Sequence, residues 1–309
     1  MKFIKELIEG DRLTGQFLVS NISKGVNSLG SQYYNVEFKD CTGTLVAKKW
    51  EINPGDETIF QVGNIVESMV EIIKYRESLQ AKILSARQMH NDEIDFVRFI
   101  QHPPRPKEEL EKEYLAFLES VKEPTCRALL DYFYDKYKKT LFIYPAASSI
   151  HHEYSSGLLM HTVSMAKLGE FIAKSYPNIN RDLLITGIML HDVGKLRELE
   201  GPIVFHYSLE GKLVGHISIM AAEIKEASDI LGLNNETSLL LQHMILSHHG
   251  QLEYGSPVLP LTSEALVLHF IDNIDSKITI LNKALDETEV GAYTNKVFPL
   301  DGRQFYKHK

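Results

Sequence analysis

The stretch Ile185-Thr-Gly-Ile-Met-Leu-His-Asp-Val-Gly-Lys195 ends an apolar helical run with two groups that can bind a metal ion. His191 and Asp192 place a neutral imidazole directly beside a carboxylate. Nitrogen and carboxylate ligands together suit Mn, Fe, Co or Zn, whereas an all-oxygen set suits Mg or Ca better. A single histidine in an apolar helix is more often a core residue than a ligand, so the pair needs companions elsewhere in the chain.

Those companions recur at intervals that fit one helix and its loop. His161 precedes the pair, and about 24 to 32 residues separate consecutive elements of the series. The elements that follow the pair are His216, the adjacent His248 and His249, and Asp272. The sequence therefore predicts that successive helices each bring one ligand to a shared site.

The order His, His-Asp, His, His-His, Asp resembles the HD-domain superfamily of metal-dependent phosphohydrolases over residues 145–285. In that superfamily the first His, the His-Asp pair and the last Asp hold one metal. The corresponding residues are His161, His191, Asp192 and Asp272. The resemblance to two-metal members implies that His216 and His248 hold a second ion and that Asp192 bridges both.

Three neighbours of these ligands have expected roles as well. Lys195 matches the lysine of the HD-x-x-K motif, so Asp192 and Lys195 are the expected catalytic residues, with the ammonium neutralising transition-state charge. For His249 three roles remain: a third ligand, a group that orients a ligand, or a phosphate contact. Adjacent helical residues point about 100° apart, so His248 and His249 cannot have the same role. Asp275, one turn after Asp272, is expected to fix a neighbouring group rather than to bind metal.

Length and composition set the broad class of the protein. The chain has 309 residues and 44% hydrophobic content, enough for two ordinary domains. Cys41 and Cys126 stand alone, which predicts neither a disulfide framework nor a zinc finger. The sequence has neither a signal-peptide core nor an apolar run of about 18 residues. We therefore expect a cytoplasmic protein without a membrane partner.

The net charge of −8 is not spread evenly along the chain. Residues 1–90 contain 11 Lys and Arg against 11 Asp and Glu, whereas residues 91–309 contain 22 against 30. Some of the acidic excess can be metal ligands, and bound divalent ions reverse the local potential. Net charge therefore neither supports nor excludes a polyanionic substrate.

The N-terminal part reads as strands and the remainder as helices. Five β-rich runs are separated by Asn, Gly and Asp, namely 15–22, 32–38, 44–50, 64–73 and 79–84. Five short strands fit an OB-fold, a small barrel that often binds single-stranded nucleic acid. We predict an α+β multidomain protein: a five-stranded OB-fold barrel at 1–90, a linker at 91–106, and an all-α HD domain at 107–309.

Several side chains are candidates for contact with a nucleic-acid strand. Tyr33, Lys48 and Arg76 are expected to stack on bases or contact phosphates. Trp50 could have the same role or belong to the barrel core. His151 and His152 lie shortly before the first ligand, where one of them could contact a terminal nucleotide or simply pack.

Two strings, one leading to the first ligand and one near the C-terminus, are more specific than the ligands themselves. Ile150-His-His-Glu-Tyr-Ser-Ser-Gly-Leu-Leu-Met-His-Thr162 and Phe298-Pro-Leu-Asp-Gly-Arg-Gln-Phe-Tyr306, with an OB module ahead of an HD domain, resemble the YhaM family of bacterial 3'-to-5' exoribonucleases. The resemblance covers essentially the whole chain. A second Gly and an acidic residue expected near Ser156 and Met160 are missing, but neither supplies a ligand.

This resemblance implies a hydrolase with two Mn²⁺ ions, with Co²⁺, Fe²⁺ or Zn²⁺ as alternatives. It would release nucleoside 5'-monophosphates from the 3' end of single-stranded RNA, and its range could extend to single-stranded DNA. A homo-oligomer is compatible with the sequence, which does not determine it. Two other classes remain: an HD phosphohydrolase of small nucleotides or cyclic dinucleotides, and a nucleic-acid-binding factor with a silent HD domain. The barrel counts against the first, and the complete ligand series counts against the second.

Overall fold

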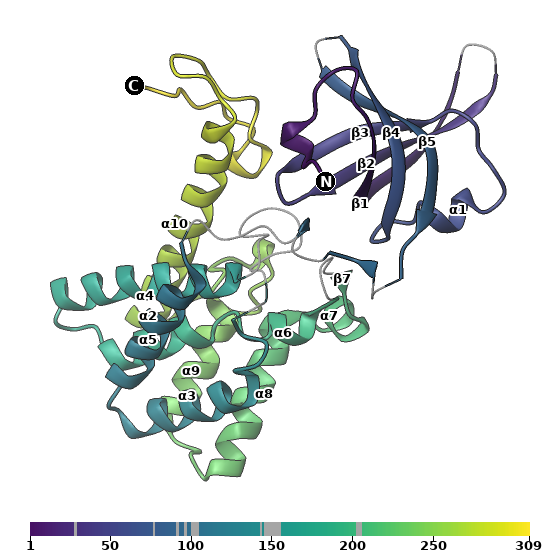
Figure 1. Cartoon of the computed structure of the whole chain (residues 1–309). Coiled ribbons are helices and arrows are strands. Elements are labelled where there is room, and N and C mark those ends of the chain that lie inside the picture. Colours follow the sequence, from purple (N-terminus) through teal and green to yellow (C-terminus); the bar gives the residue numbers. More distant parts are fainter. Residues whose placement is uncertain are drawn as a thin grey trace. The chain divides into compact units, whose positions relative to one another are not determined.

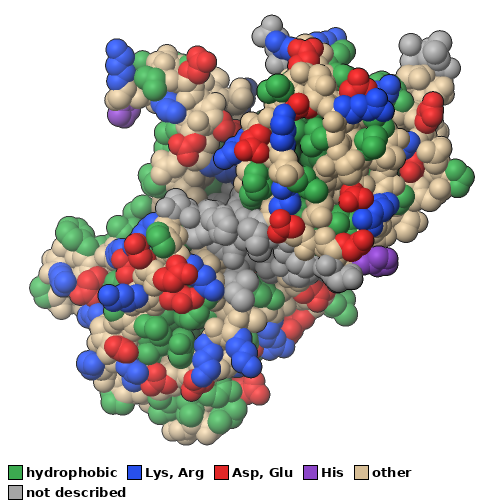
Figure 2. Space-filling model, in the orientation of Figure 1, with side chains coloured by type: hydrophobic (Ala, Val, Ile, Leu, Met, Phe, Trp, Pro, Cys, Tyr) green, Lys and Arg blue, Asp and Glu red, His purple; other side chains and the backbone are tan. Residues whose placement is uncertain are grey.

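The structure is a computed structural model that describes residues 1–27, 30–76, 78–90, 93–95, 98–99, 105–142, 144, 156–201 and 206–309. The chain divides into two compact units, Met1–Gln101 and His102–Lys309 (Figure 1). Acidic and basic side chains are interspersed over the face of the molecule that Figure 2 shows. Within the described residues, no helix combines the length and the apolar character needed to cross a bilayer.

The first unit is a closed five-stranded barrel. Its strands are β1 (Arg12–Val26), β2 (Gln32–Asp40), β3 (Gly43–Lys49), β4 (Ile65–Tyr75) and β5 (Ser78–Gln88). They close in the order β1-β2-β3-β5-β4, in which only β3 and β5 run parallel. This order is that of an OB-fold, so the predicted barrel is confirmed.

Alternating side chains build the barrel core. Along β2, Tyr34, Val36 and Phe38 are buried while their neighbours are more exposed, as a strand with one face on a core requires. The Phe38 ring stacks on Phe17 with 4.8 Å between ring centroids. The short helix α1 (Asp56–Ile59) lies between β3 and β4, and the 3-10 turn η1 (Ile4–Glu6) precedes β1.

Residues from the stretch expected as a linker also belong to the first unit. The Gln16 side-chain amide donates to the Glu93 carbonyl at 3.2 Å and accepts from the Asp95 backbone N–H at 3.1 Å. The Arg98 guanidinium donates to the Lys2 carbonyl at 2.8 Å. Through these contacts, residues that follow the last strand belong to the barrel unit.

The second unit is a bundle of helices. Its larger helices are α2 (Lys107–Ser120), α3 (Pro124–Tyr137), α4 (Gly157–Ser175), α5 (Arg181–Leu190), α8 (Gly215–Leu231), α9 (Glu236–Ser247) and α10 (Ser263–Asp286). Shorter elements are α6 (Lys195–Glu198), α7 (Leu209–Leu213), η4 (Leu252–Tyr254) and η5 (Phe298–Leu300). A two-stranded ribbon of β6 (Leu199–Glu200) and β7 (His206–Tyr207) lies among these helices. The sequence pattern did not predict this ribbon.

Helix α5 lies at the centre of the bundle. Its residues from Leu183 to Leu190 are all buried, and the Asn180 side chain caps its first turn by accepting from the Leu183 backbone N–H. The turn after α5 packs tightly on the start of α8 at Gly194, where an added Cβ would come within 2.3 Å of the His216 carbonyl oxygen. Packing thus fixes the position of the turn that carries the His-Asp pair.

Candidate metal centre

The predicted ligands come from five helices and meet inside the bundle. His161 lies in α4, His191 and Asp192 directly follow α5, His216 lies in the first turn of α8, His248 directly follows α9, and Asp272 lies in α10. His161, His191, Asp192 and His248 are almost fully buried. The structure therefore gathers all six residues that the spacing selected.

Four of these residues form one group. The Nε2 atoms of His161 and His191 are 3.3 Å apart, and His161 Nε2 is 3.3 Å from Asp272 Oδ1. Asp192 Oδ2 lies 3.3 Å from His191 Nε2 and 3.8 Å from His161 Nε2. Ligand atoms bound to one ion at about 2.0 to 2.2 Å lie about this far from one another.

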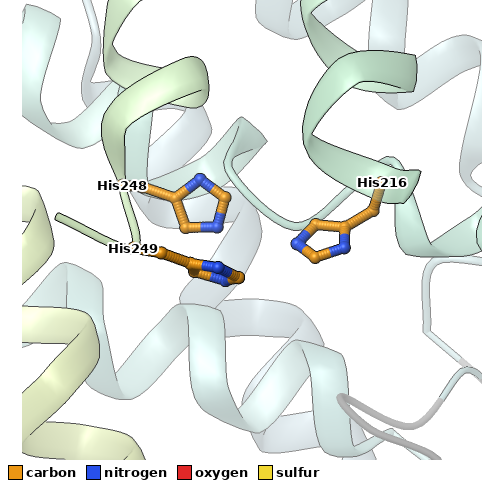
Figure 3. Close-up of side chains that lie close together, drawn as sticks. All are labelled: His216, His248 and His249. Atoms are coloured by element: carbon orange, nitrogen blue, oxygen red, sulfur yellow. The ribbon is translucent and has the colours of Figure 1, made fainter. Parts of the chain in front are cut away.

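The remaining histidines form a second group that shares Asp192. Asp192 Oδ1 lies 3.5 Å from His216 Nε2 and 3.9 Å from His248 Nε2. His249 joins them, because each of the three histidines has a ring nitrogen within 4.8 Å of the other two. Figure 3 shows the His248 and His249 rings at the end of α9 facing the His216 ring on α8. The two oxygens of Asp192 thus face one group each.

Three buried ligand atoms in this region have no hydrogen-bond partner among the described residues. They are Asp192 Oδ1, His216 Nε2 and His248 Nε2. An unsatisfied buried polar atom normally costs about 1 to 3 kcal/mol. A cation between them would satisfy all three, so these residues fit a metal ion.

The outer nitrogens of three histidines are held by backbone carbonyls. His191 Nδ1 lies 2.7 Å from the Ile188 carbonyl and His248 Nδ1 lies 2.7 Å from the Ile245 carbonyl. His249 Nδ1 is likewise 2.7 Å from the carbonyl of Tyr254. A carbonyl only accepts, so each Nδ1 carries a proton, and Nε2 is the nitrogen that a metal can reach.

Carboxylates hold the other two histidines. His161 Nδ1 lies 2.7 Å from Asp275 Oδ2, which matches the orienting role expected for Asp275. Glu198 Oε1 accepts from both the backbone N–H and Nδ1 of His216, each at 3.0 Å. Sequence reasoning missed Glu198, because no ligand spacing singles out a residue that acts only on another ligand.

Electrostatics keep the second group in its metal-binding form. Burial, with the neighbouring His249 and His191, holds the pKa of His248 well below its usual range. Burial and the nearby His216 lower the pKa of His249 as well. Burial alone would raise the pKa of Asp192, but Lys195 and His191 outweigh it and hold that pKa well below the usual value. The neutral imidazoles of His248 and His249 therefore lie near an ionised carboxylate.

Lys195 forms an ion pair with Asp192. Its Nζ is 2.7 Å from Asp192 Oδ2, and its side chain is mostly buried. Burial lowers the pKa of Lys195, but Asp192 more than offsets this, and the net shift is upward. The ammonium is therefore charged beside the carboxylate shared by both groups.

Metal binding at His161 should release a proton that can be measured. Burial lowers its pKa, but Asp272 and Asp275 outweigh burial and raise that pKa to about 10 in the protein without metal. Below this pKa the ring holds a proton on each nitrogen, and a metal must displace the one on Nε2. Metal affinity should therefore rise between pH 6 and pH 9, by about tenfold per pH unit from this group, with release of about one proton per first ion bound.

Calorimetric titration with Mn²⁺ in buffers of different ionisation enthalpy measures this release. His161→Asn removes the proposed donor and should abolish that proton. Metal binding at pH 7.5 with no proton released from the intact protein would contradict the assignment.

The predicted strand contacts on the barrel also come together. Lys48 Nζ lies 5.4 Å from the Tyr33 ring centroid, 5.2 Å from that of Trp50 and 5.7 Å from that of Tyr75. The Tyr33 and Trp50 centroids are 4.7 Å apart, and Arg76 lies over the Tyr75 ring at 5.4 Å. We call these five residues the ring cluster. Trp50 is 38% exposed, so it does not belong to the barrel core.

Gly25 allows the Tyr33 ring to occupy this place. The two residues pair across β1 and β2, and an added Cβ on Gly25 would come within 2.5 Å of the ring. Tyr75, at the end of β4, completes the cluster. His151 and His152 lie outside the described residues.

Comparison with known proteins identifies the family of this chain. The HD domain family model matches residues 158–277, the segment that contains all six predicted ligands. The chain is 39% identical over 299 residues to the 3'-5' exoribonuclease YhaM of Geobacillus sp. (strain WCH70), covering 96% of this chain and 92% of that protein. It is 38% identical over 299 residues to the 3'-5' exoribonuclease YhaM of Bacillus velezensis, covering 96% and 95%.

Among solved structures, the second OB-fold domain of replication protein A from Methanococcus maripaludis matches with 18% identity and a TM-score of 0.25. This match covers 29% of the present chain and 95% of that domain. The identity to the two bacterial relatives extends over both units of the chain. The chain therefore belongs to the YhaM family of 3'-5' exoribonucleases, with its HD domain in the second unit.

Proposed function

We propose that this protein is a metal-dependent 3'-to-5' exoribonuclease that releases nucleoside 5'-monophosphates from single-stranded RNA. The observation that carries the proposal is the group of three unpartnered buried atoms, Asp192 Oδ1, His216 Nε2 and His248 Nε2, beside a complete His161-His191-Asp192-Asp272 group. A silent HD domain would be expected to lack part of this set.

The donor set supports two divalent ions, with Mn²⁺ as our proposal and Co²⁺, Fe²⁺ or Zn²⁺ as alternatives. His161, His191, Asp192 and Asp272 would hold one ion, and Asp192, His216 and His248 the other. When bound, the ions supply an activated water and charge stabilisation for an in-line displacement at phosphorus. His249 lies within the second group, so the role of a third ligand suits its position best.

The residues of the chain contribute three effects to this reaction. Asp275 and Glu198 fix the rings of His161 and His216, so that both Nε2 atoms point at the site. Burial of the ligands excludes water and strengthens every charge interaction there. The Lys195 ammonium, near Asp192, would offset the charge that develops on the phosphate.

The ring cluster would hold the strand that the HD domain shortens. Stacking on aromatic rings and attraction to Lys48 and Arg76 do not depend on base identity, which supports low sequence selectivity. Stacking and attraction to phosphates do not require the 2'-hydroxyl, so we propose that single-stranded DNA is also a substrate. A hydrolase of small nucleotides would have no use for this cluster.

Polarity of degradation tests the proposal. A 5'-labelled single-stranded RNA with a 3'-phosphate should be shortened at least about tenfold more slowly than the same RNA with a 3'-hydroxyl, a loss of about 1.4 kcal/mol of transition-state binding. The reason is that a terminal phosphate enlarges the 3' end, which must fit into the site before the last phosphodiester can reach the metals. Gel analysis of the products with Mn²⁺, and with EDTA as control, measures the rates.

A blocked 5' end on the same RNA is the matched control and should change the rate little. If a circular RNA is cut as fast as the linear one, the enzyme is an endonuclease. Preferential hydrolysis of a cyclic dinucleotide over the RNA would favour the small-nucleotide class instead.

A further inference from the structure

The barrel contains a cavity beside the ring cluster that the proposed function does not use. Strands β3 and β5 pair only at Val46–Lys48 with Gln80–Lys82, and they separate beyond these residues. The cavity, of about 390 Å³, lies where they part. Its lining residues are Lys49, Trp50, Glu51, Lys82, Ile83 and Leu84.

Lys49 is the unusual member of this lining. Its side chain takes the inward position that follows Leu45 and Ala47 along β3, and it is only 5% exposed. Within the part of the chain that the structure describes, it has neither a hydrogen bond nor an ion pair to another side chain. The barrel encloses the carbon chain of Lys49 and leaves its ammonium unpaired at the cavity, where an anion from outside the chain can pair with it.

The rest of the lining indicates which anion fits. Lys82, exposed on β5, adds a second positive charge against the single Glu51, so the cavity has a net positive charge. Trp50 belongs to both the cavity and the ring cluster, where its ring stands 4.7 Å from that of Tyr33. A base stacked in the cluster would therefore have its neighbouring phosphate close to the two lysines.

We propose that this cavity is a phosphate-binding subsite for a single strand, with Lys49 as its buried anchor and Lys82 as its outer contact. This inference rests on the proposed capture of a strand by the ring cluster. It extends the path of the bound nucleic acid from the ring cluster to the point where strands β3 and β5 separate. The chemical class of the ligand is a phosphodiester of single-stranded RNA or DNA, and a free phosphate shares the same chemistry.

Lys49→Met and Lys82→Met in the full chain test the subsite. Binding of a fluorescein-labelled 12-nucleotide oligouridylate is measured by anisotropy in EDTA, which stops hydrolysis, at several salt concentrations. Each variant should bind about tenfold more weakly near 100 mM salt, and the slope of log K against log salt should shrink by about 0.7, the value for one lost phosphate contact with a single strand. Lys5→Met, at an exposed position of the same unit, loses the same charge and should leave the slope unchanged.

Two further measurements keep the outcomes distinct. Inorganic phosphate at millimolar concentration is compared with an equal ionic strength of added salt. If phosphate weakens strand binding to the intact protein more than the salt does, and this extra effect is absent in Lys49→Met, the site also takes free phosphate. Because Lys82 is exposed, Lys82→Met does not depend on the fold tolerating a change at Lys49. Unchanged affinity and slope in Lys82→Met and in folded Lys49→Met would overturn the subsite. Rapid Mn²⁺-dependent shortening of saturating RNA by the same variants would show that the proposed activity survives that failure.

Discussion

Asp192→Ala is expected to reduce hydrolysis by about 10³-fold or more with every divalent metal, because it removes the carboxylate that faces both ligand groups. One oxygen of Asp192 lies near His161 and His191, and the other lies near His216 and His248. No other side chain described here faces both groups in this way. Loss of it should lower the affinity for both ions and not only the rate.

The measurement pairs shortening of end-labelled RNA with the metal content of the purified variant. Asp192→Asn keeps the volume and serves as the conservative partner, while Asp286→Ala removes an exposed acid from the end of α10 and should change nothing. The fold should survive, since the side chain of Lys195 retains some access to water after its partner is lost. Near-normal turnover by the alanine variant would show that the ligand assignment is wrong.

The ligand series could be predicted because helices separate residues in a regular way. His161, His191, His216, His248 and Asp272 follow one another at intervals of one helix and a loop, and this spacing survives any detail of packing. The barrel was predictable for a similar reason, since alternating residues such as Val36 and Phe38 mark a strand with one buried face.

Other parts of the site depend on contacts between distant segments. Glu198 reaches His216 only because α6 packs beside the start of α8, and nothing in the local sequence marks it as the partner of a ligand. Lys49 follows a run of alternating residues like any strand end. Alternation accounts for its inward side, but its cavity arises where β3 and β5 part, a feature of sheet closure that no local pattern encodes. Sequence patterns thus find ligands that obey a period and a neighbour such as Asp275 one turn from a ligand, whereas the role of Glu198 emerges only from the fold.

The second large effect is expected from the ring cluster. Replacing Tyr33, Lys48 and Arg76 together by alanine in the intact chain should weaken the binding of long single-stranded RNA by about one to four orders of magnitude. Stacking contributes about 1 to 3 kcal/mol per base, and the change removes about two such contacts at 1.4 kcal/mol per tenfold in affinity. Turnover at saturating RNA should change little, because every proposed metal ligand lies in the other unit.

Rates measured over a range of RNA concentrations separate the two effects, since only KM should rise. The matched control replaces Lys5 and Arg12, two exposed cations on the same unit, and removes the same charge without touching the rings. A short oligonucleotide that does not reach the barrel should be degraded equally well by the intact protein and by the triple variant, because its binding depends on the HD domain alone. If the triple variant shortens long RNA at low concentration as efficiently as the intact protein, the ring cluster does not capture the strand, and its exposed rings must serve another partner.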